Sequence, residues 1–222
     1  MAAFLANVGV NAGHAARSPL FADGTFALLP IPERRPWRKP MLRLRELPAL
    51  RAHAPRSWRD VAVHLDPDLA SETPTYGDNC RRAGRAFSLR RARQGDVIVF
   101  LARLATAPQT CGFHLVGRLE IDGALEDVTR DPGPGWWDGN AHVRRARARG
   151  QWDSFWVFHG NARSRLFARA VPFTRRETEL LFGSGTRWPA HRTELQTIGS
   201  YTRSVRRLEG REEEWLRAIC PS

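Results

Sequence analysis

Two short segments carry residues that could form a base-binding pocket or an acid–base pair. In the first, His64 lies two residues before Asp66; in the second, Tyr76 lies beside a predicted Gly-Asp turn that ends at Asp78. A tyrosine next to a carboxylate offers a stacking face and a hydrogen-bond acceptor, which suit a single-stranded or flipped base. A histidine beside an aspartate is more often a structural pair than a catalytic dyad, and no serine or cysteine is placed to complete a triad.

A loop rich in glycine and proline, residues 131–142, contains two adjacent tryptophans and precedes a run of arginines. Trp136 and Trp137 either pack inward and close one end of the fold or stack on a ligand. Beside Arg144 and Arg145 they combine an aromatic face with phosphate-binding cations, as in proteins that hold unpaired bases at ~1–3 kcal/mol per stacked base. We expect Trp136 to contact the ligand.

Four polar residues nearer the N-terminus are further candidates for the same pocket. Asn7 and Asn11 flank the end of a predicted strand, where an amide can read a base edge or close a turn. Asp23 and Glu33 could act as acid and base or hold a metal ion. The alternative is that Asp23 forms a turn with Gly24 and that Glu33 is solvated or ion-paired.

The chain is strongly basic, with 35 Lys and Arg against 23 Asp and Glu and a formal net charge of +12. A basic surface attracts phosphate polyanions, so DNA or RNA is the expected partner. Only Lys39 is a lysine, and GC-rich coding also produces such a bias towards arginine, although it does not explain the excess of positive charge. The predicted phosphate contacts are Arg17, Arg82, Arg144, Arg145 and Arg203.

Length and composition exclude several classes of protein. With 222 residues, 42% of them hydrophobic, the chain suits one domain, which we place over residues 1–222. No apolar run approaches the ~18 residues of a membrane span, and the first ten residues lack the basic segment of a signal peptide. Three scattered cysteines form neither a disulfide framework nor a zinc motif, so we expect a reducing cytoplasm, no cofactor and no metal.

The elements that position these residues are mostly strands. A Gly-Asp turn at Gly95 releases apolar, β-branched runs at 97–104 and 112–121, which predict an antiparallel pair. Residues 11–40 predict a long irregular excursion with an Asp-Gly turn at 23–24. The other predicted strands are 1–10, 57–65, 152–158 and 165–173.

Helix signals are concentrated near the C-terminus. Thr174 and Glu177 form a capping-box pattern, and Gly183 follows at a distance that ends a helix of two turns. A last helix is indicated by apolar residues on one face after three glutamates. Residues 42–52 could form a short helix or a strand, with a break at Pro48. The chain is therefore predicted to be α+β.

Several of these pieces, in the same order along nearly the whole chain, resemble the third family of nucleotide modification associated domains. The pieces are Asn7–Asn11, Ser18–Phe21 with Asp23-Gly24, Pro30–Glu33, Thr75–Asp78, the Gly95-Asp96 hairpin and Ile198–Arg203. The resemblance implies a PUA-like fold, related to ASCH and EVE domains, with a mixed or antiparallel β-barrel core and short peripheral helices. It also implies a pocket surrounded by Asn7, Asn11, Asp23, Glu33, Tyr76 and Asp78.

The function that these observations favour is a module that recognises a modified or flipped base in DNA or RNA, associated with nucleotide modification or defence systems. One alternative is an enzyme acting on a nucleotide or modified base through loop carboxylates and histidines, and another is a scaffold protein. The candidate acid–base groups of the enzyme are Asp23, Glu33, His64, Asp66, Asp78 and His142. An enzyme needs several of these groups around one cavity, whereas a base reader needs an aromatic wall and a basic rim.

Overall fold

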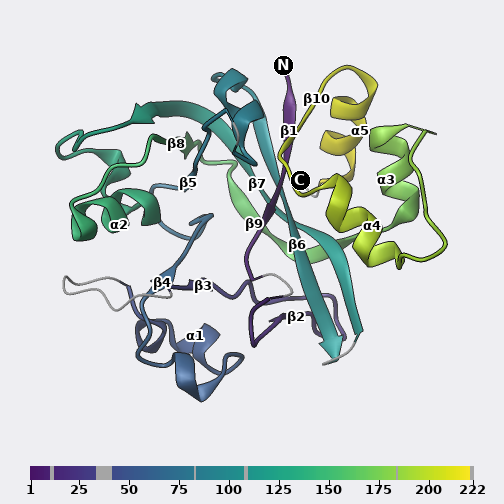
Figure 1. The fold of residues 1–222 in the computed structure, drawn as a ribbon, viewed down its shortest axis with the longest axis horizontal. Coiled ribbons are helices and arrows are strands. Elements are labelled where there is room, and N and C mark those ends of the chain that lie inside the picture. Colours follow the sequence, from purple (N-terminus) through teal and green to yellow (C-terminus); the bar gives the residue numbers. More distant parts are fainter. Residues whose placement is uncertain (11–12, 34–41, 83, 108–109, 184, 221–222) are drawn as a thin grey trace.

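One large mixed sheet forms the centre of the protein (Figure 1). The computed structural model describes residues 1–222 except 11–12, 34–41, 83, 108–109, 184 and 221–222. The strand order is β10-β1-β6-β7-β8-β5, with β2 added to β6 and β9 to β7. The strands are β1 Ala3–Val8, β2 Ser18–Pro19, β5 Thr75–Asp78, β6 Val97–Ala107, β7 Thr110–Val128, β8 Phe155–Gly160, β9 Arg165–Phe173 and β10 Arg206–Leu208.

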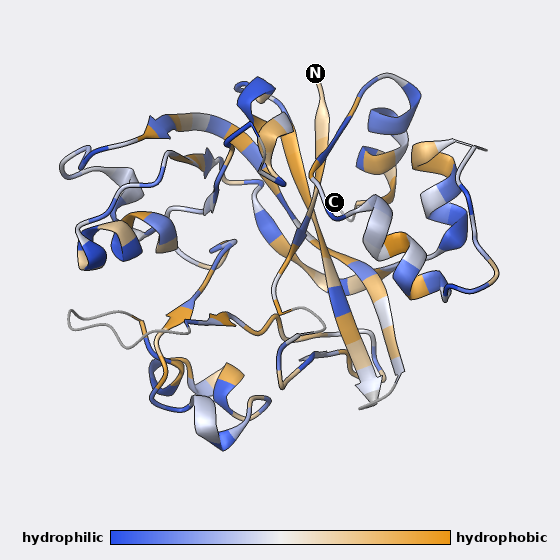
Figure 2. Cartoon of the chain, viewed as in Figure 1, coloured by the Kyte–Doolittle hydropathy of each residue, from blue (hydrophilic) through white to orange (hydrophobic). Residues whose placement is uncertain are grey.

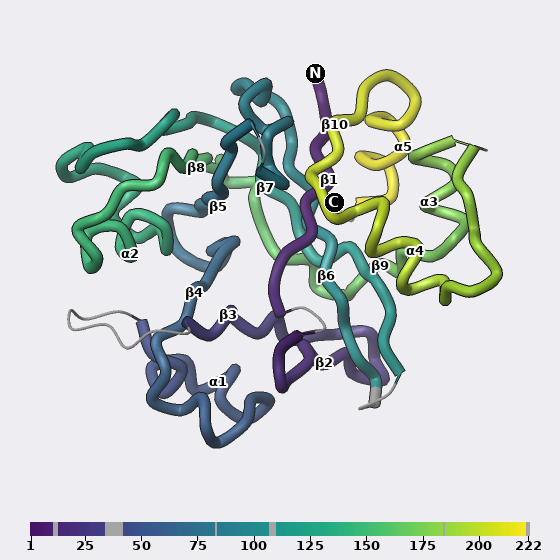
Figure 3. Tube along the Cα trace, in the orientation of Figure 1, coloured from purple at the N-terminus to yellow at the C-terminus, as the bar shows by residue number. Residues whose placement is uncertain are grey.

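The predicted hairpin is confirmed as the antiparallel pair of β6 and β7. It begins at the predicted turn, where Gly95 has a φ of +86° that favours glycine. The buried Asp96 carboxylate accepts hydrogen bonds from the backbone N–H groups of Ala2, at 2.6 Å, and Arg93, at 3.0 Å. β1 pairs with β6 in parallel, from Ala3 opposite Val97 to Val8 opposite Ala102 (Figure 3). The bond from Ala2 to Asp96 therefore joins the two strands where both begin. The sheet is therefore mixed.

The sheet is open, and the expected barrel closure is not seen among the described strands. Its path ends at β10 on one side and at β5 on the other, and these two strands do not pair with each other. The long strand β7 pairs with β6 and β9 in its first part and with β8 in its last part. Irregularities between Ile121 and Gly123 and between Leu125 and Val128 interrupt the register with β8, and such bulges bend a strand.

Alternating side chains of the central strands build two cores, one on each face of the sheet. Phe4, Ile98 and Phe100 belong to the first core, together with buried residues of β5 and β8. Leu5 and Val99 belong to the second core, which is covered by three helices. These helices are α3 Arg175–Phe182, α4 Glu194–Tyr201 and α5 Arg211–Ile219. The strands at the centre of the sheet are largely hydrophobic, whereas the helices show both colours (Figure 2).

A small lobe lies beside the large sheet and has its own cluster of buried residues, among them Leu29, Leu44 and Val63. It contains an antiparallel pair, β3 Ile31–Pro32 and β4 Val63–His64. The remaining short elements of the lobe are the 3-10 helices Leu44–Glu46 and Arg56–Trp58 and helix α1 Pro48–Arg51. Proline at the first position of α1 starts this helix instead of breaking one, because proline costs no hydrogen bond there.

Most predicted elements are confirmed, including the helix capped by Thr174 and ended by Gly183. Two predictions need correction, and two helices were not predicted. The strand predicted at 57–65 is present only at Val63–His64, because Arg56–Trp58 form a 3-10 helix. The Gly-Asp pair after Tyr76 is part of strand β5 and not a turn, because residues 75–78 pair with β8. Helix α2, Ala141–Arg149, was not expected because its sequence has little apolar periodicity, although alanine and arginine favour a helix. Helix α4 was also missed, although Thr193 and Gln196 carry its capping-box signal.

Candidate functional site

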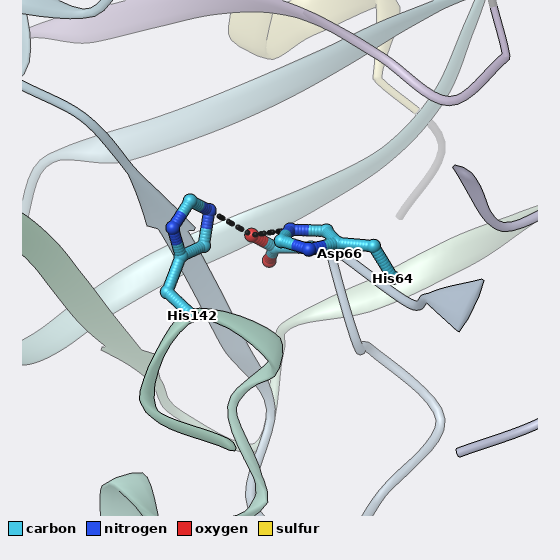
Figure 4. Close-up of side chains that lie close together, drawn as sticks. All are labelled: His64, Asp66 and His142. Carbon is cyan, nitrogen blue, oxygen red and sulfur yellow. Dashed lines mark ion pairs between the residues drawn. The ribbon is translucent and has the colours of Figure 1, made fainter. Parts of the chain in front are cut away.

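The candidate site is a buried cluster of two histidines and one aspartate (Figure 4). His64 ends β4, Asp66 follows two residues later, and His142 lies in the first turn of α2. The Asp66 carboxylate oxygen Oδ2 is 3.5 Å from His64 Nε2 and 3.3 Å from His142 Nε2. All three residues are less than a tenth exposed. The small lobe, the edge of the large sheet and α2 therefore meet at one polar centre.

The local structure around β5 explains why the three side chains meet. The Gly77 N–H donates to both carboxylate oxygens of Asp66, each at 3.0 Å. Asn140 caps α2 by accepting from the His142 N–H at 2.9 Å, and its side-chain amide donates to the hydroxyl of Thr75 at 3.1 Å. A Cβ at position 77 would lie only 2.7 Å from His142 Cδ2, so glycine is required for this close approach.

An outer pair of charges completes the cluster. Glu33 Oε1 lies 3.3 Å from Nδ1 of His64 and 3.8 Å from Nη1 of Arg145. Arg145 also approaches His142, with 3.4 Å between Nη2 and Nδ1. Each member of this five-residue cluster therefore contacts at least two others, and the guanidinium of Arg145 and the imidazole of His64 lie beside the two carboxylates. Glu33 is ion-paired, as one of the two sequence interpretations expected.

The pKa values of the two histidines are shifted in opposite directions. Burial lowers the pKa of His64, but hydrogen bonds to Asp66 and Glu33 outweigh it, so the pKa is raised. Burial also lowers the pKa of His142, and the contact with Asp66 does not compensate, so this pKa stays below its usual value. Burial raises the pKa of Asp66, but His142 and His64 outweigh it and the net shift is downward. Burial also raises the pKa of Glu33, but His64 and Arg145 outweigh it, so this pKa is lowered as well.

A small pocket, with room for about one water molecule, lies beside this cluster, and His64 and Asp66 form part of its lining. Its other lining residues come from the segments that the sequence analysis singled out: Gly9, Leu28, Leu29, Pro30, Ile31, Leu65 and Pro67. A neighbouring pocket shares Leu65 and is lined by Asp68 and Arg144 among others. The tertiary structure therefore brings Gly9, Pro30–Ile31 and His64–Pro67 to one pocket.

A second polar network joins Asp78 to the first strand. Oδ2 of Asp78 accepts from the hydroxyl of Tyr76 at 2.7 Å and from Nη2 of Arg85 at 3.0 Å. Nη1 of Arg85 donates to the backbone carbonyl of Asn7 at 3.2 Å. Tyr76 is only 2% exposed and its ring packs edge-on against Phe100. A stacking role for Tyr76 would therefore require its ring to leave the first core.

The remaining predicted ligand residues lie apart from the cluster or outside the described residues. Asp23 is exposed and accepts hydrogen bonds from the N–H and hydroxyl of Thr25, so it forms the turn that the alternative interpretation expected. Trp136 is half-buried and stacks on His159 with 5.0 Å between ring centroids. Asn11 lies outside the described residues.

The predicted phosphate contacts have different surroundings. Arg17 donates to the backbone carbonyls of His14 and Ala16, Arg145 is part of the buried cluster, and Arg144 lines the neighbouring pocket. Arg82 and Arg203 are exposed. Sequence reasoning missed Arg85 as a site residue and named His142 only for the enzyme alternative. Asn140 is a helix N-cap signal in the sequence. Recognising it would have placed His142 in the first turn of a helix.

These features define an α+β protein with an open mixed sheet and a buried His-Asp-His cluster beside a small pocket. The model of the family nucleotide modification associated domain 3 matches residues 3–217, and the chain belongs to this family, as its sequence resemblance indicated. Comparisons with curated proteins and with solved structures give no match. The family links the protein to nucleotide modification. None of the helices in the described part of the chain has the length and apolar character of a membrane span.

Proposed function

We propose that the protein binds nucleic acid and recognises a modified or flipped base. The observation that carries this proposal is a group of exposed arginines on two adjacent segments. The backbone N–H of Val205 donates to the carbonyl of Arg85 at 2.7 Å, and the Ser88 hydroxyl donates to the carbonyl of Val205 at 2.8 Å. Residues 81–93 and 203–207, which both carry several arginines, therefore lie side by side.

Four arginines of these segments are exposed and make no ion pair with any described residue: Arg82, Arg91, Arg93 and Arg203. We call them the arginine face. Exposed guanidinium groups without a carboxylate partner are available to phosphate oxygens, and Arg binds phosphate in a bidentate manner. Arg85, in the same segment, holds the carbonyl of Asn7, and Gly9 two residues later lines the pocket. A strand bound on this face would therefore pass close to the pocket.

The proposal is tested by fluorescence anisotropy with labelled single- and double-stranded oligonucleotides, plain and base-modified, at two salt concentrations. The variant Arg82→Gln/Arg91→Gln/Arg203→Gln is expected to weaken binding and to reduce the log–log salt slope by ~0.9 per lost contact on duplex DNA. The matched control, Arg176→Gln/Arg192→Gln/Arg211→Gln, removes the same charge from the side of the protein that carries α3, α4 and α5. Equal losses in both variants, or no binding by the wild type at ~50 mM salt, would contradict the proposal.

A second candidate function, an enzyme acting on a nucleotide or modified base, is favoured by the buried cluster itself. Glu33, His64, Asp66 and His142 lie within reach of one another, and two of them line a pocket. Such a convergence is what acid–base or metal-assisted chemistry requires. The two functions are distinguished by incubating the protein with nucleotides and oligonucleotides and looking for a chemical change by mass spectrometry.

A PUA-like relationship is part of the same proposal. It is supported by the hairpin of β6 and β7 that follows the Gly95-Asp96 turn and by the parallel pairing of β1 with β6. In this interpretation the base would be held beside β5, the strand at one edge of the sheet.

A further inference from the structure

We propose that His64 Nε2, Asp66 Oδ2 and His142 Nε2 bind one divalent transition-metal ion. The inference is independent of nucleic-acid binding and adds a cofactor to the second candidate function. It starts from the convergence in Figure 4, where two imidazole nitrogens approach the same carboxylate oxygen. The three ligand atoms lie within 4.8 Å of one another, and all three residues are buried.

The two separations from Asp66 Oδ2 match those between ligands of one metal ion. Charge-assisted hydrogen bonds between nitrogen and oxygen are usually about 2.7–2.9 Å long. The distances to Asp66 Oδ2, 3.3 and 3.5 Å, are longer than that. In a tetrahedral zinc site with bonds of about 2.0–2.1 Å, neighbouring ligand atoms are about 3.3–3.4 Å apart. Asp66 is therefore spaced from each of the two histidines as it would be around an ion.

The residues around the three ligands are those that orient metal ligands in proteins. Glu33 contacts Nδ1 of His64, the nitrogen opposite the proposed ligand atom, at 3.3 Å. A carboxylate in this position fixes the tautomer and the ring orientation of a metal-binding histidine. The Gly77 N–H holds the carboxylate of Asp66 in place. Two of the three ligands thus have outer partners suited to metal binding.

Arg145 is the one neighbour that opposes the ion. Its Nη2 lies 3.4 Å from Nδ1 of His142, and this nitrogen must carry the proton when Nε2 binds a metal. Binding therefore requires Arg145 to turn away from His142 and towards Glu33, which it already approaches at 3.8 Å. The loaded site then holds the dication, two carboxylates and one guanidinium, which leaves a net positive charge for an anionic ligand.

Two histidines and one carboxylate, with no cysteine, favour zinc in a catalytic site or ferrous iron, both of which keep open coordination positions. His64 and Asp66 line the pocket, so an open position at the ion would be accessible from it. A hydroxide or a phosphate oxygen would match the net positive charge of the loaded site. The chemistry that the ion would supply is activation of water or polarisation of a phosphoryl or carbonyl oxygen.

The test is a titration of Zn²⁺ and Co²⁺ into the untagged, chelator-treated chain, followed by calorimetry and by the visible absorption of bound Co²⁺. We expect one ion per chain for the wild type. Asp66→Asn and His142→Gln should lose this binding, and Glu33→Gln should weaken it 10–100-fold. Arg145→Gln should bind more tightly, because it removes the opposing cation. His191→Gln, at an exposed position, is the matched control and should bind like the wild type.

Less than one equivalent of metal on the folded wild-type chain would overturn the proposal, whatever the variants do. Equal binding by His142→Gln and the wild type would also overturn it. The gain in affinity of Arg145→Gln cannot result from misfolding, so it separates a metal site from a merely structural cluster. Because the titration contains no nucleic acid, its failure leaves the binding function standing, and failure of the anisotropy experiment leaves the metal site standing.

Discussion

At the scale of single residues, the site depends on contacts between side chains that are distant in the sequence. His64 and Asp66 are neighbours in the chain and could have formed an isolated structural pair. His142 changes this interpretation because it reaches the same carboxylate oxygen from α2. Gly77 allows the approach, since any side chain at this position would meet the imidazole ring. The smallest residue of the site is therefore as important for its geometry as the charged ones.

We predict that Gly77→Ala destabilises the protein by about 1–3 kcal/mol, the usual effect of overpacking. The added Cβ would lie 2.7 Å from His142 Cδ2 and 2.9 Å from Asn140 Oδ1, so the start of α2 must move. The free energy of unfolding in urea measures the effect. Gly123→Ala in β7 is the control, because a Cβ there has nothing within 4 Å. Equal stabilities of the two variants would show that α2 is not held against β5 in this way.

At the scale of elements, helix ends are where local sequence controls local structure most directly. Thr174 and Glu177 bond to each other at the start of α3: the Thr174 N–H donates to Glu177 Oε2 at 2.8 Å. Burial raises the pKa of Glu177, but the bonds from Thr174 outweigh it, so the pKa lies below 4.5. A carboxyl whose pKa is lowered on folding stabilises the protein above its unfolded pKa, and this contribution is lost as the pH falls through the folded pKa.

We therefore predict that Glu177→Gln reduces the loss of stability between pH 6 and pH 3. Glutamine keeps an acceptor for the Thr174 N–H but has no charge to lose. At pH 6 the variant should be about 0.3–1 kcal/mol less stable, because it no longer places a negative charge at the helix N-terminus. Thermal unfolding at the two pH values checks this. A variant that loses as much stability between pH 6 and pH 3 as the wild type would contradict this prediction.

At the scale of the whole molecule, one sheet separates two cores with different tasks. The first core and the small lobe support the polar cluster, the pocket and the arginine face. The second core is covered by α3, α4 and α5 and contains none of the candidate site residues. This separation lets the helical side determine stability without forming part of the site.

We predict that Leu216→Ala, at a fully buried position of α5, costs about 2–5 kcal/mol of stability. Metal and oligonucleotide binding by the folded variant should stay at wild-type strength, because Leu216 lies in the second core. Chemical unfolding and the two titrations described above measure this separation. Leu180→Ala, about half exposed on α3, should change stability by less than ~0.5 kcal/mol. Weaker metal binding by folded Leu216→Ala would show that the two sides are coupled.

The sequence analysis correctly predicted features that depend on residues a few positions apart. The Gly95-Asp96 turn, the hairpin after it and the capped helix from Thr174 to Gly183 are all present. The family could also be identified from the sequence, because its motifs occur in order along the chain. Turn, cap and strand preferences arise from local hydrogen bonds and sterics, so a linear sequence carries them directly.

Only the tertiary structure decided which residues meet. Tyr76 is a plausible stacking residue by type, but pairing of β5 with β8 and packing on Phe100 place it in the first core. Conversely, His142 lies in an arginine-rich segment with little amphipathic pattern, and it joins the cluster because α2 is anchored to Thr75 through Asn140. The sheet is open because the strands at its two ends, β10 and β5, do not pair with each other. Long-range contacts of this kind depend on burial and on the whole topology, which local sequence preferences do not specify.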